Sequence, residues 1–229
     1  MFALGHRGAP EVHFENTLAG FQAAVKLGAD GVELDARRTL DGCWVVHHDA
    51  CPPGSQTAID RMPISRIELL RLPDGSSIPT LQAALRALRG AARVVVEIKG
   101  RSSARGIESV IHLSRDHGVT LSSFNHPMLA RLSDASIPLA LTMDRIQEDP
   151  VTKAARLGAR ELHLWHPLWT RQRVRSARQR GILTVAWTVD RLDDLRRLAA
   201  LGVEGVITNR LEAVLHYLRQ NELPQEGSA

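Results

Sequence analysis

One phrase recurs along the chain and limits how it can fold: a helix-like stretch ends in glycine, and a short apolar run follows directly. The glycines are Gly28, Gly118, Gly158, Gly181 and Gly202. A glycine after a helix supplies the left-handed residue that ends it. The apolar runs, rich in β-branched residues, have the composition of buried strands. Helices that alternate with short buried strands predict βα units and a parallel sheet.

Eight strands fit this pattern, with helices between them. The predicted strands span residues 2–5, 32–35, 94–98, 120–123, 139–142, 161–164, 183–187 and 205–207. The predicted helices span residues 17–27, 81–89, 103–117, 127–134, 151–157, 171–179, 192–200 and 211–218. Eight βα repeats predict an α/β fold, a (β/α)8 TIM barrel, in preference to a doubly wound sheet. No glycine-rich dinucleotide fingerprint follows the first strand, which argues against a Rossmann fold.

The second βα unit departs from this pattern. Asp41-Gly42 is a strong hairpin signal, and it lies between the strand at 32–35 and another apolar run at 44–48. We therefore expect a short insertion after strand two, a hairpin that carries His48 back over the barrel mouth. Residues 50–79 are less regular and are predicted to hold one helix, at 65–72. We interpret residues 1–219 as a single domain and residues 220–229 as a polar C-terminal tail.

The composition is that of a globular protein, with 44% hydrophobic and 24% charged residues. No apolar run is long enough to cross a membrane, and Met1 begins no secretory leader. We therefore expect a cytoplasmic protein with no stable membrane insertion, in which Cys43 and Cys51 are reduced. The net charge of +4 includes five arginines of one predicted helix, at 171, 173, 175, 178 and 180. Without interleaved aromatic residues or a nucleic-acid motif, they predict a solvated helix face and no nucleic-acid partner.

Three carboxylates stand at predicted strand ends. Glu33 and Asp35 are two residues apart on one strand, so their side chains point to the same face. Glu97, followed by Lys99, ends the next strand in the same way. A lone glutamate there would be interpreted as an exposed charge or an ion pair with arginine. Three carboxylates that converge at a barrel mouth instead favour a hard divalent cation, Mg²⁺ or Ca²⁺.

Two histidines also stand at the mouth. His6 ends the first strand and His48 ends the hairpin, and imidazoles exchange protons near neutral pH. His47 competes with His48, and strand alternation alone does not choose between them. Arg7 follows His6, and its guanidinium suits a phosphate or a carboxylate. The remaining histidines at strand or loop positions are interpreted as structural, namely His13, His126, His163 and His166.

The ordered motifs resemble those of the glycerophosphodiester phosphodiesterase family, from Leu4 to about Val214. The matching stretches are His6-Arg7-Gly8, Glu15-Asn16-Thr17, residues 31–35, Asp41-Gly42, Val45-Val46 with His48-Asp49, residues 78–81 and 96–99, Ser123-Phe124, residues 187–189 and residues 205–208. The resemblance implies a TIM barrel and the hydrolysis of a small-molecule glycerophosphodiester to sn-glycerol 3-phosphate and an alcohol. It also implies a divalent metal cofactor, Mg²⁺ or Ca²⁺.

The resemblance further implies a role for each site residue. His6 and His48 match the catalytic pair, and the family pattern selects His48 because it directly precedes an aspartate. The matches to the metal ligands are Glu33, Asp35 and Glu97. Those to the phosphate and substrate contacts are Arg7, Lys99, Glu15, Trp187 and Phe124. Glu15 is expected to orient Arg7 or to cap the following helix. The two aromatic residues are expected to wall the substrate, with barrel packing as the alternative.

Other functions stay open at this point. One is a lysophospholipase D or a phospholipase-C-like enzyme acting on a lipid, which an exposed apolar rim would favour. Another is a catalytically silent barrel that binds a phosphate ligand, although such a chain would be expected to lack a histidine or a carboxylate. The sequence also leaves open the alcohol head group, the native metal, which histidine is the base, and whether the protein is a monomer or a homodimer.

Overall fold

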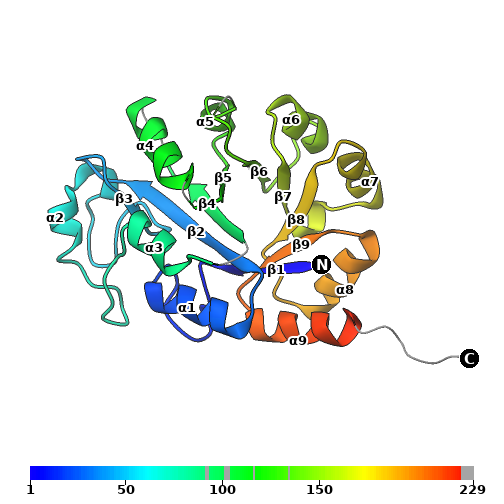
Figure 1. Ribbon diagram of the computed structural model, residues 1–229, viewed down its shortest axis with the longest axis horizontal. Coiled ribbons are helices and arrows are strands. Elements are labelled where there is room, and N and C mark those ends of the chain that lie inside the picture. The colour runs from blue at the N-terminus through cyan, green and yellow to red at the C-terminus, as the bar shows by residue number, and fades with distance from the viewer. Residues whose placement is uncertain (91–92, 101–103, 116, 134, 223–229) are drawn as a thin grey trace, which may run out of the picture.

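The computed structural model describes residues 1–90, 93–100, 104–115, 117–133 and 135–222. Within these residues, eight parallel strands close into a ring because β1 pairs with both β2 and β9 (Figure 1). The fold is therefore the predicted (β/α)8 barrel. The ring strands, in order, are β1 (Phe2–His6), β2 (Gly31–Arg38), β4 (Arg93–Ile98), β5 (Val119–Ser123), β6 (Leu139–Met143), β7 (Glu161–Trp165), β8 (Leu183–Trp187) and β9 (Gly205–Thr208).

Helices surround the ring of strands (Figure 1). They are α1 (Leu18–Leu27), α3 (Leu81–Ala87), α4 (Ala104–Arg115), α5 (His126–Ala130), α6 (Pro150–Arg156), α7 (Arg171–Gln179), α8 (Leu192–Leu201) and α9 (Leu211–Glu222). The five glycines of the recurrent phrase all have positive φ, from 62° to 87°, as the helix-ending role requires. The main apolar core lies between these helices and the strands.

The predicted hairpin is present. β3 (Trp44–Val46) runs antiparallel to the end of β2, with Ala36 opposite Val46 and Arg38 opposite Trp44. β2 therefore continues to Arg38, beyond the predicted end at Asp35. The segment at 50–79 covers this hairpin with an apolar cluster of its own, formed by Val45, Ile59, Met62, Ile67, Leu72 and Ile78. The hairpin thus rests on a small satellite core, which fixes the position of the residues that follow β3.

Several predicted helix boundaries were wrong. The helix expected at 65–72 is only α2 (Ile64–Ile67); after it, the N–H groups of Leu69 and Leu70 donate to carbonyl oxygens three residues back, as in a turn. Two short 3₁₀ helices, η1 (Ile59–Arg61) and η2 (His166–Leu168), were not predicted. α5 ends at Ala130, and α9 continues to Glu222. Predicted helix or tail residues at 103, 116, 134 and 223–229 lie outside the described part of the chain.

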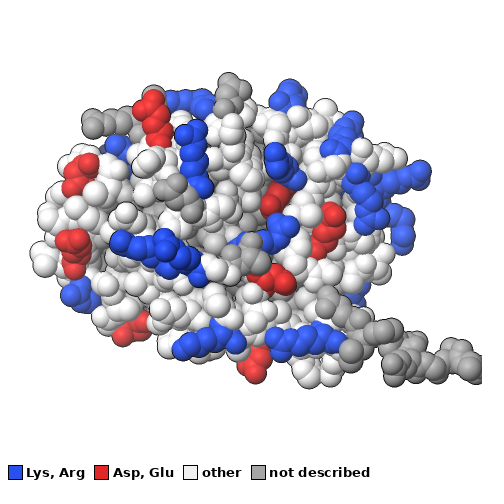
Figure 2. All heavy atoms as spheres, in the orientation of Figure 1, with Lys and Arg blue, Asp and Glu red and all other residues white. Residues whose placement is uncertain are grey.

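The charged surface agrees with the prediction for α7. Val174 and Ala177 of this helix are buried, while Arg171, Arg175 and Arg178 are exposed. On the face shown in Figure 2, basic side chains gather beside α7 and elsewhere lie among acidic ones. The arginine run is therefore a solvated helix face. No helix among the described residues has both the length and the apolar character needed to span a membrane.

The barrel interior is closed below its mouth. Leu4, Val95, Val185 and Ile207 project inward from four strands, and each is 3% exposed or less. Polar side chains that face inward nearer the carboxyl ends of the strands therefore lie above an apolar floor. This arrangement leaves a recess at the mouth, where barrel active sites occur.

The first strand ends in a tight turn formed by Gly5, His6, Arg7 and Gly8. The Gly8 N–H donates a hydrogen bond to the Gly5 carbonyl oxygen at 3.3 Å. Arg7 and Gly8 have φ angles of 56° and 99°. A Cβ atom at Gly8 would lie 2.8 Å from the carbonyl carbon of Gly20 in α1. Glycine at this position lets the turn pack against α1 and keeps His6 and Arg7 at the mouth.

We expect Gly8→Ala to lower the free energy of unfolding by about 2–4 kcal/mol, because a positive φ and a backbone collision both oppose a Cβ atom. Gly75→Ala is the matched control: Gly75 also has a positive φ, 84°, but no described atom lies within 4 Å of its Cβ position. It should cost only about 1–2 kcal/mol. Urea denaturation followed by circular dichroism measures both, and equal losses would contradict the packing argument.

Candidate active site

A cavity of about 190 Å³ lies at the carboxyl ends of the barrel strands. Ten of the thirteen residues that line it are charged or polar, and most come from the ends of different strands. The sequence analysis predicted the site residues at this end of the barrel. The lining residues are His6, Arg7, Glu33, His48, Glu97, Lys99, Ser122, Phe124, Thr142, His163, Trp187, Thr188 and Ile207.

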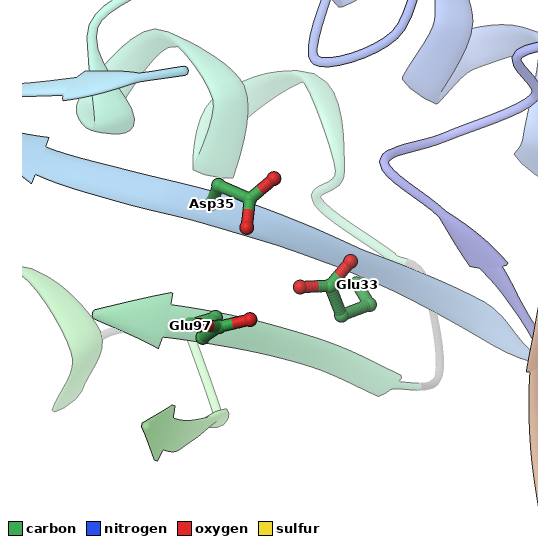
Figure 3. A group of neighbouring side chains, drawn as sticks. All are labelled: Glu33, Asp35 and Glu97. Carbon is green, nitrogen blue, oxygen red and sulfur yellow. The ribbon is translucent and has the colours of Figure 1, made fainter. Parts of the chain in front are cut away.

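The three predicted carboxylates meet at this cavity. Glu33 and Asp35 project from β2 and Glu97 projects from β4, and their carboxyl groups point toward one another (Figure 3). Asp35 and Glu97 are register partners on the neighbouring strands. Each residue offers an oxygen atom such that the three atoms lie within 4.8 Å of one another, and all three side chains are buried. The period-two spacing on β2 thus brings the groups together as predicted.

Two cations partly balance these carboxylates. Lys99 Nζ lies 2.7 Å from Glu97 Oε1 and 3.1 Å from Asp35 Oδ1. Arg7 Nε lies 3.1 Å from Asp35 Oδ2. Burial raises the pKa of Asp35, but Lys99 and Arg7 outweigh burial and hold that pKa below its usual range. The charges of Asp35 and its two partners therefore stay in place at neutral pH.

Glu33 is in the opposite situation. Burial, followed by the charges of Asp35 and Glu97, raises its pKa well above the ordinary value. Burial also raises the pKa of Glu97. The three carboxylates share two cations, and one of these, Arg7, also pairs with Glu15, so acidic groups outnumber cations at the cluster. An all-oxygen donor set with excess negative charge fits a hard divalent cation such as Mg²⁺ or Ca²⁺.

His6 is held by a chain of hydrogen bonds. Its Nδ1 lies 2.7 Å from Asn209 Oδ1, and the Asn209 Nδ2 and backbone N–H both donate to the Asp190 carboxylate at 2.8 Å. The carboxylate turns the amide oxygen toward the imidazole, which places the ring proton on Nδ1. Burial, followed by the charge of Arg7, lowers the pKa of His6. A neutral imidazole with an unprotonated Nε2 is thereby favoured, and this atom lies 3.9 Å from Glu33 Oε2.

His48 lies in a different environment. It follows the hairpin and lines the cavity, whereas His47 is buried and is not among the described residues that line it. The His48 Nδ1 lies 2.8 Å from Asp49 Oδ1. Arg37 Nε and Nη2 donate to the His48 carbonyl oxygen at 2.8 and 2.6 Å. The structure thus places His48 in the cavity, the choice that strand alternation alone left open.

Glu15 contacts Arg7 and does not cap a helix. Both of its carboxylate oxygens accept hydrogen bonds from Arg7 Nη1, at 2.8 and 2.9 Å. Helix α1 is capped by Thr17, whose side-chain oxygen accepts a hydrogen bond from the Gly20 N–H. Of the two contacts expected for Glu15, with Arg7 or with the start of the following helix, the structure shows the one with Arg7. Glu15 does not reach the described cavity lining.

Phe124 and Trp187 form an aromatic wall at the mouth. Their rings meet edge to face, with centroids 5.3 Å apart, and both line the cavity. Trp187 Nε1 donates to the carbonyl oxygen of His163 at 3.1 Å. Trp165, the register partner of Trp187 on β7, was not predicted at the site. Phe124 and Trp165 are 39% and 44% exposed, so the rim on this side is apolar and open to solvent.

Several residues that contact the site were missed or misinterpreted from the sequence, and four of them bear on the argument below. His163, interpreted as structural, lines the cavity, as does Thr142. Asn209 holds His6, and Asn16 holds Asp35 through a hydrogen bond from Nδ2 to Oδ2 at 2.9 Å. Asn16 lies within the Glu-Asn-Thr motif, and Asn209 directly follows the last strand. The position of each residue in the sequence could therefore have identified it as a site residue. Thr142 and His163 lie inside apolar strands, where nothing in the sequence marks them as site residues.

The comparisons with known proteins agree with this geometry. Residues 6–213 match the model of the glycerophosphoryl diester phosphodiesterase family. The chain belongs to this family. A glycerophosphodiester phosphodiesterase of Caldanaerobacter subterraneus subsp. tengcongensis is 29% identical, over 95% of this chain and 97% of that protein. The chain is thus an enzyme, a phosphodiesterase of this family.

Solved structures show the same fold. A glycerophosphodiester phosphodiesterase of Thermotoga maritima superposes with a TM-score of 0.84 at 27% identity, covering 95% of this chain and 98% of that one. A phosphodiesterase of Oleispira antarctica, in complex with its product sn-glycerol-3-phosphate, has a TM-score of 0.88 at 20% identity and covers 96% and 97%. At that lower identity, the second likeness concerns the fold alone.

We expect cation binding at the carboxylate cluster to release protons, because Glu33 and Glu97 have raised pKa values and must ionise to act as ligands. Affinity for Mg²⁺ or Ca²⁺ should therefore rise with pH over the range in which these two carboxyl groups lose their protons, which lies above the ordinary range for glutamate. Titration calorimetry in two buffers of different ionisation enthalpy measures the released protons. Glu33→Gln should weaken binding and remove most of the release, whereas affinity independent of pH would contradict this electrostatic account.

Proposed function

We propose that the protein hydrolyses glycerophosphodiesters to sn-glycerol 3-phosphate and an alcohol by metal-dependent acid–base catalysis. The observation that carries the proposal is that His6 and His48 line one small cavity together with Glu33 and Glu97 of the carboxylate cluster. Family membership supports the reaction, and the product held by the Oleispira antarctica enzyme supports a glycerol phosphate as ligand.

The carboxylate cluster of Glu33, Asp35 and Glu97 would hold the divalent cation. When bound, Mg²⁺ or Ca²⁺ supplies Lewis acidity, which lowers the pKa of a coordinated hydroxyl and neutralises negative charge on a phosphate. The cluster's own position, buried at the edge of the cavity, sets where that chemistry takes place.

Arg7 and Lys99 are the groups suited to the phosphate. Both line the cavity, and both are held by ion pairs, Arg7 by Glu15 and Asp35 and Lys99 by Asp35 and Glu97. Burial lowers the pKa of Lys99, but the two carboxylates outweigh it and raise that pKa. Two fixed positive charges in a partly buried recess stabilise the charge that develops on phosphorus oxygens without reorganising first.

The two histidines have the settings of a base and an acid. His6 is neutral with its proton on Nδ1, so its Nε2 can take the proton from the glycerol 2-hydroxyl as that oxygen attacks phosphorus. His48 lines the same cavity, with its Nδ1 held 2.8 Å from Asp49 Oδ1, and we assign it the protonation of the leaving alcohol oxygen. Water then adds to the cyclic phosphate and opens it, with the two roles reversed. The net change is one water consumed, one P–O bond broken and one formed.

A lipid substrate is the second candidate, and a specific observation favours it. Phe124 and Trp165 leave an exposed aromatic rim on the β5–β8 side of the mouth. Such a rim offers contact area to an apolar chain. A lysophospholipase D would place that chain against the rim and use the same histidines and carboxylates, so the two candidates differ only in the substrate that is turned over.

Release of sn-glycerol 3-phosphate from glycerophosphocholine and glycerophosphoethanolamine tests the proposal. We expect release with Mg²⁺ or Ca²⁺, loss of release in EDTA, and recovery when the cation is restored.

His48→Ala should abolish turnover while calorimetric cation affinity stays near wild type, because His48 is not part of the carboxylate cluster. Release that persists in EDTA, or in His48→Ala, would contradict the mechanism. Turnover of lysophosphatidylcholine alone would select the second candidate.

The assignment of His6 as the base predicts the effect of removing its amide partner. Asn209→Leu should lower kcat by about 100-fold with little change in KM, and should shift the acid limb of the pH profile, because Nδ1 loses its acceptor. Asp190→Asn keeps an oxygen facing Asn209 Nδ2 and should retain most activity. A change in KM alone, or an unchanged pH profile, would show that Asn209 does not orient His6.

A further inference from the structure

One wall of the cavity is polar and is not used by the proposed reaction. It consists of Ser122 on β5, Thr142 on β6 and His163 on β7, here called the β5–β7 wall. All three side chains line the cavity, and they are 2%, 5% and 1% exposed. On β8, the register partner of His163 is the apolar Val185, whereas Ser122 pairs in register with Glu97 of the carboxylate cluster. The burial of three polar side chains on adjacent strands therefore needs a functional explanation.

The Thr142 hydroxyl is the most informative member of this wall. Its Oγ1 is buried and has no hydrogen-bond partner among the described residues, although it lies at the cavity. A buried hydroxyl without a partner is costly, and valine would fill the same space without that cost. A threonine here is explained if a bound molecule supplies the missing hydrogen bond.

His163 is fixed from behind. Its Nε2 lies 2.9 Å from Glu161 Oε2, and Glu161 Oε1 accepts hydrogen bonds from Thr120 Oγ1 at 3.1 Å and Arg93 Nη1 at 3.3 Å. Burial raises the pKa of Glu161, but the contacts with His163 and Arg93 outweigh burial and lower that pKa. Glu161 is therefore a carboxylate, and the His163 Nε2 donates to it. A preset imidazole and a free hydroxyl on adjacent, register-paired positions suit recognition of an uncharged hydroxyl.

We propose that the β5–β7 wall binds the terminal hydroxyl of the substrate's glycerol, with Thr142 Oγ1 as its direct partner. The inference rests on the proposed function and names a specificity determinant for it. Of the three glycerol oxygens, one is esterified to phosphorus and one attacks it, which leaves one without an assigned partner. The phosphate belongs beside Arg7 and Lys99, so the remaining hydroxyl is directed to the β5–β7 wall on the other side of the cavity.

This placement has a consequence for substrate class. The wall is buried, and the cavity of about 190 Å³ is below the roughly 300–1,000 Å³ usual for drug-sized ligands. A glycerol whose terminal oxygen carries an acyl chain would have to bury that chain against three polar side chains. The enzyme should therefore select diesters with a free terminal hydroxyl, and the exposed aromatic rim then serves the leaving alcohol.

The test compares two substrates that differ only in this hydroxyl: glycerophosphocholine and 2-hydroxypropyl phosphocholine, which keeps the attacking hydroxyl. The wild type should prefer glycerophosphocholine in kcat/KM by about tenfold or more. Thr142→Val should lower kcat/KM for glycerophosphocholine about tenfold and leave that for the analogue within about twofold. This ratio does not depend on the fraction of folded enzyme.

Ser114→Ala is the matched control. Ser114 is 1% exposed, and its Oγ likewise has no hydrogen-bond partner among the described residues, but it lies on α4 away from the cavity lining. It should change neither substrate's kcat/KM. Equal losses on both substrates in Thr142→Val, no preference in the wild type, or turnover of 1-acyl lysophosphatidylcholine as fast as glycerophosphocholine would each overturn the inference.

A binding measurement separates this inference from the proposed function. If no diester is turned over, the proposed function fails, yet calorimetry can still compare sn-glycerol 3-phosphate with 2-hydroxypropyl phosphate. Tighter binding of sn-glycerol 3-phosphate by the wild type, with the difference lost in Thr142→Val, would support the wall as a hydroxyl site. Equal affinities of the wild type for both ligands would overturn it.

Discussion

The site depends on holding three buried carboxylates next to one another against their mutual repulsion. Lys99 and Arg7 make this possible because each lies within ion-pair distance of Asp35, the acid that stays charged. These contacts link the end of β4, the end of β2 and the turn after β1. The same two side chains line the cavity. Groups that hold the cluster together are thus also the groups positioned to meet an anionic substrate.

The barrel gives the two histidines unlike surroundings, although both serve one cavity. His6 is part of the closed ring of strands and is held through an amide to a carboxylate. His48 comes from a hairpin outside the ring and contacts a carboxylate directly. The satellite core under residues 50–79 supports that hairpin. Two chemically identical rings therefore have different hydrogen-bond partners, an amide oxygen for His6 and a carboxylate for His48.

The parts of this molecule that follow short-range rules could be predicted from the sequence. Glycine-ended helices followed by apolar runs predict the barrel, and residues two apart on a strand share a face, which predicts the pairing of Glu33 with Asp35. The choice of His48 over His47 needed the family pattern, because a hairpin's exit does not follow strand alternation. Thr142 and His163 could not be found, since their significance depends on strands that only the closed ring brings together. The predicted ends of helices were wrong where a local turn replaces the helix, as in the segment before Pro73.

The backbone around Arg7 and Asn16 sets a limit on how stable this enzyme can become. Both residues have left-handed φ, 56° and 58°, and the Asn16 N–H donates to the Arg7 carbonyl oxygen at 2.9 Å. Glycine would relax either position, yet Arg7 supplies a guanidinium and Asn16 an amide that the site uses. Selection for thermal tolerance can therefore improve the helices and the outer core freely, but it meets a trade-off at this mouth, where conformational strain and function reside in the same residues.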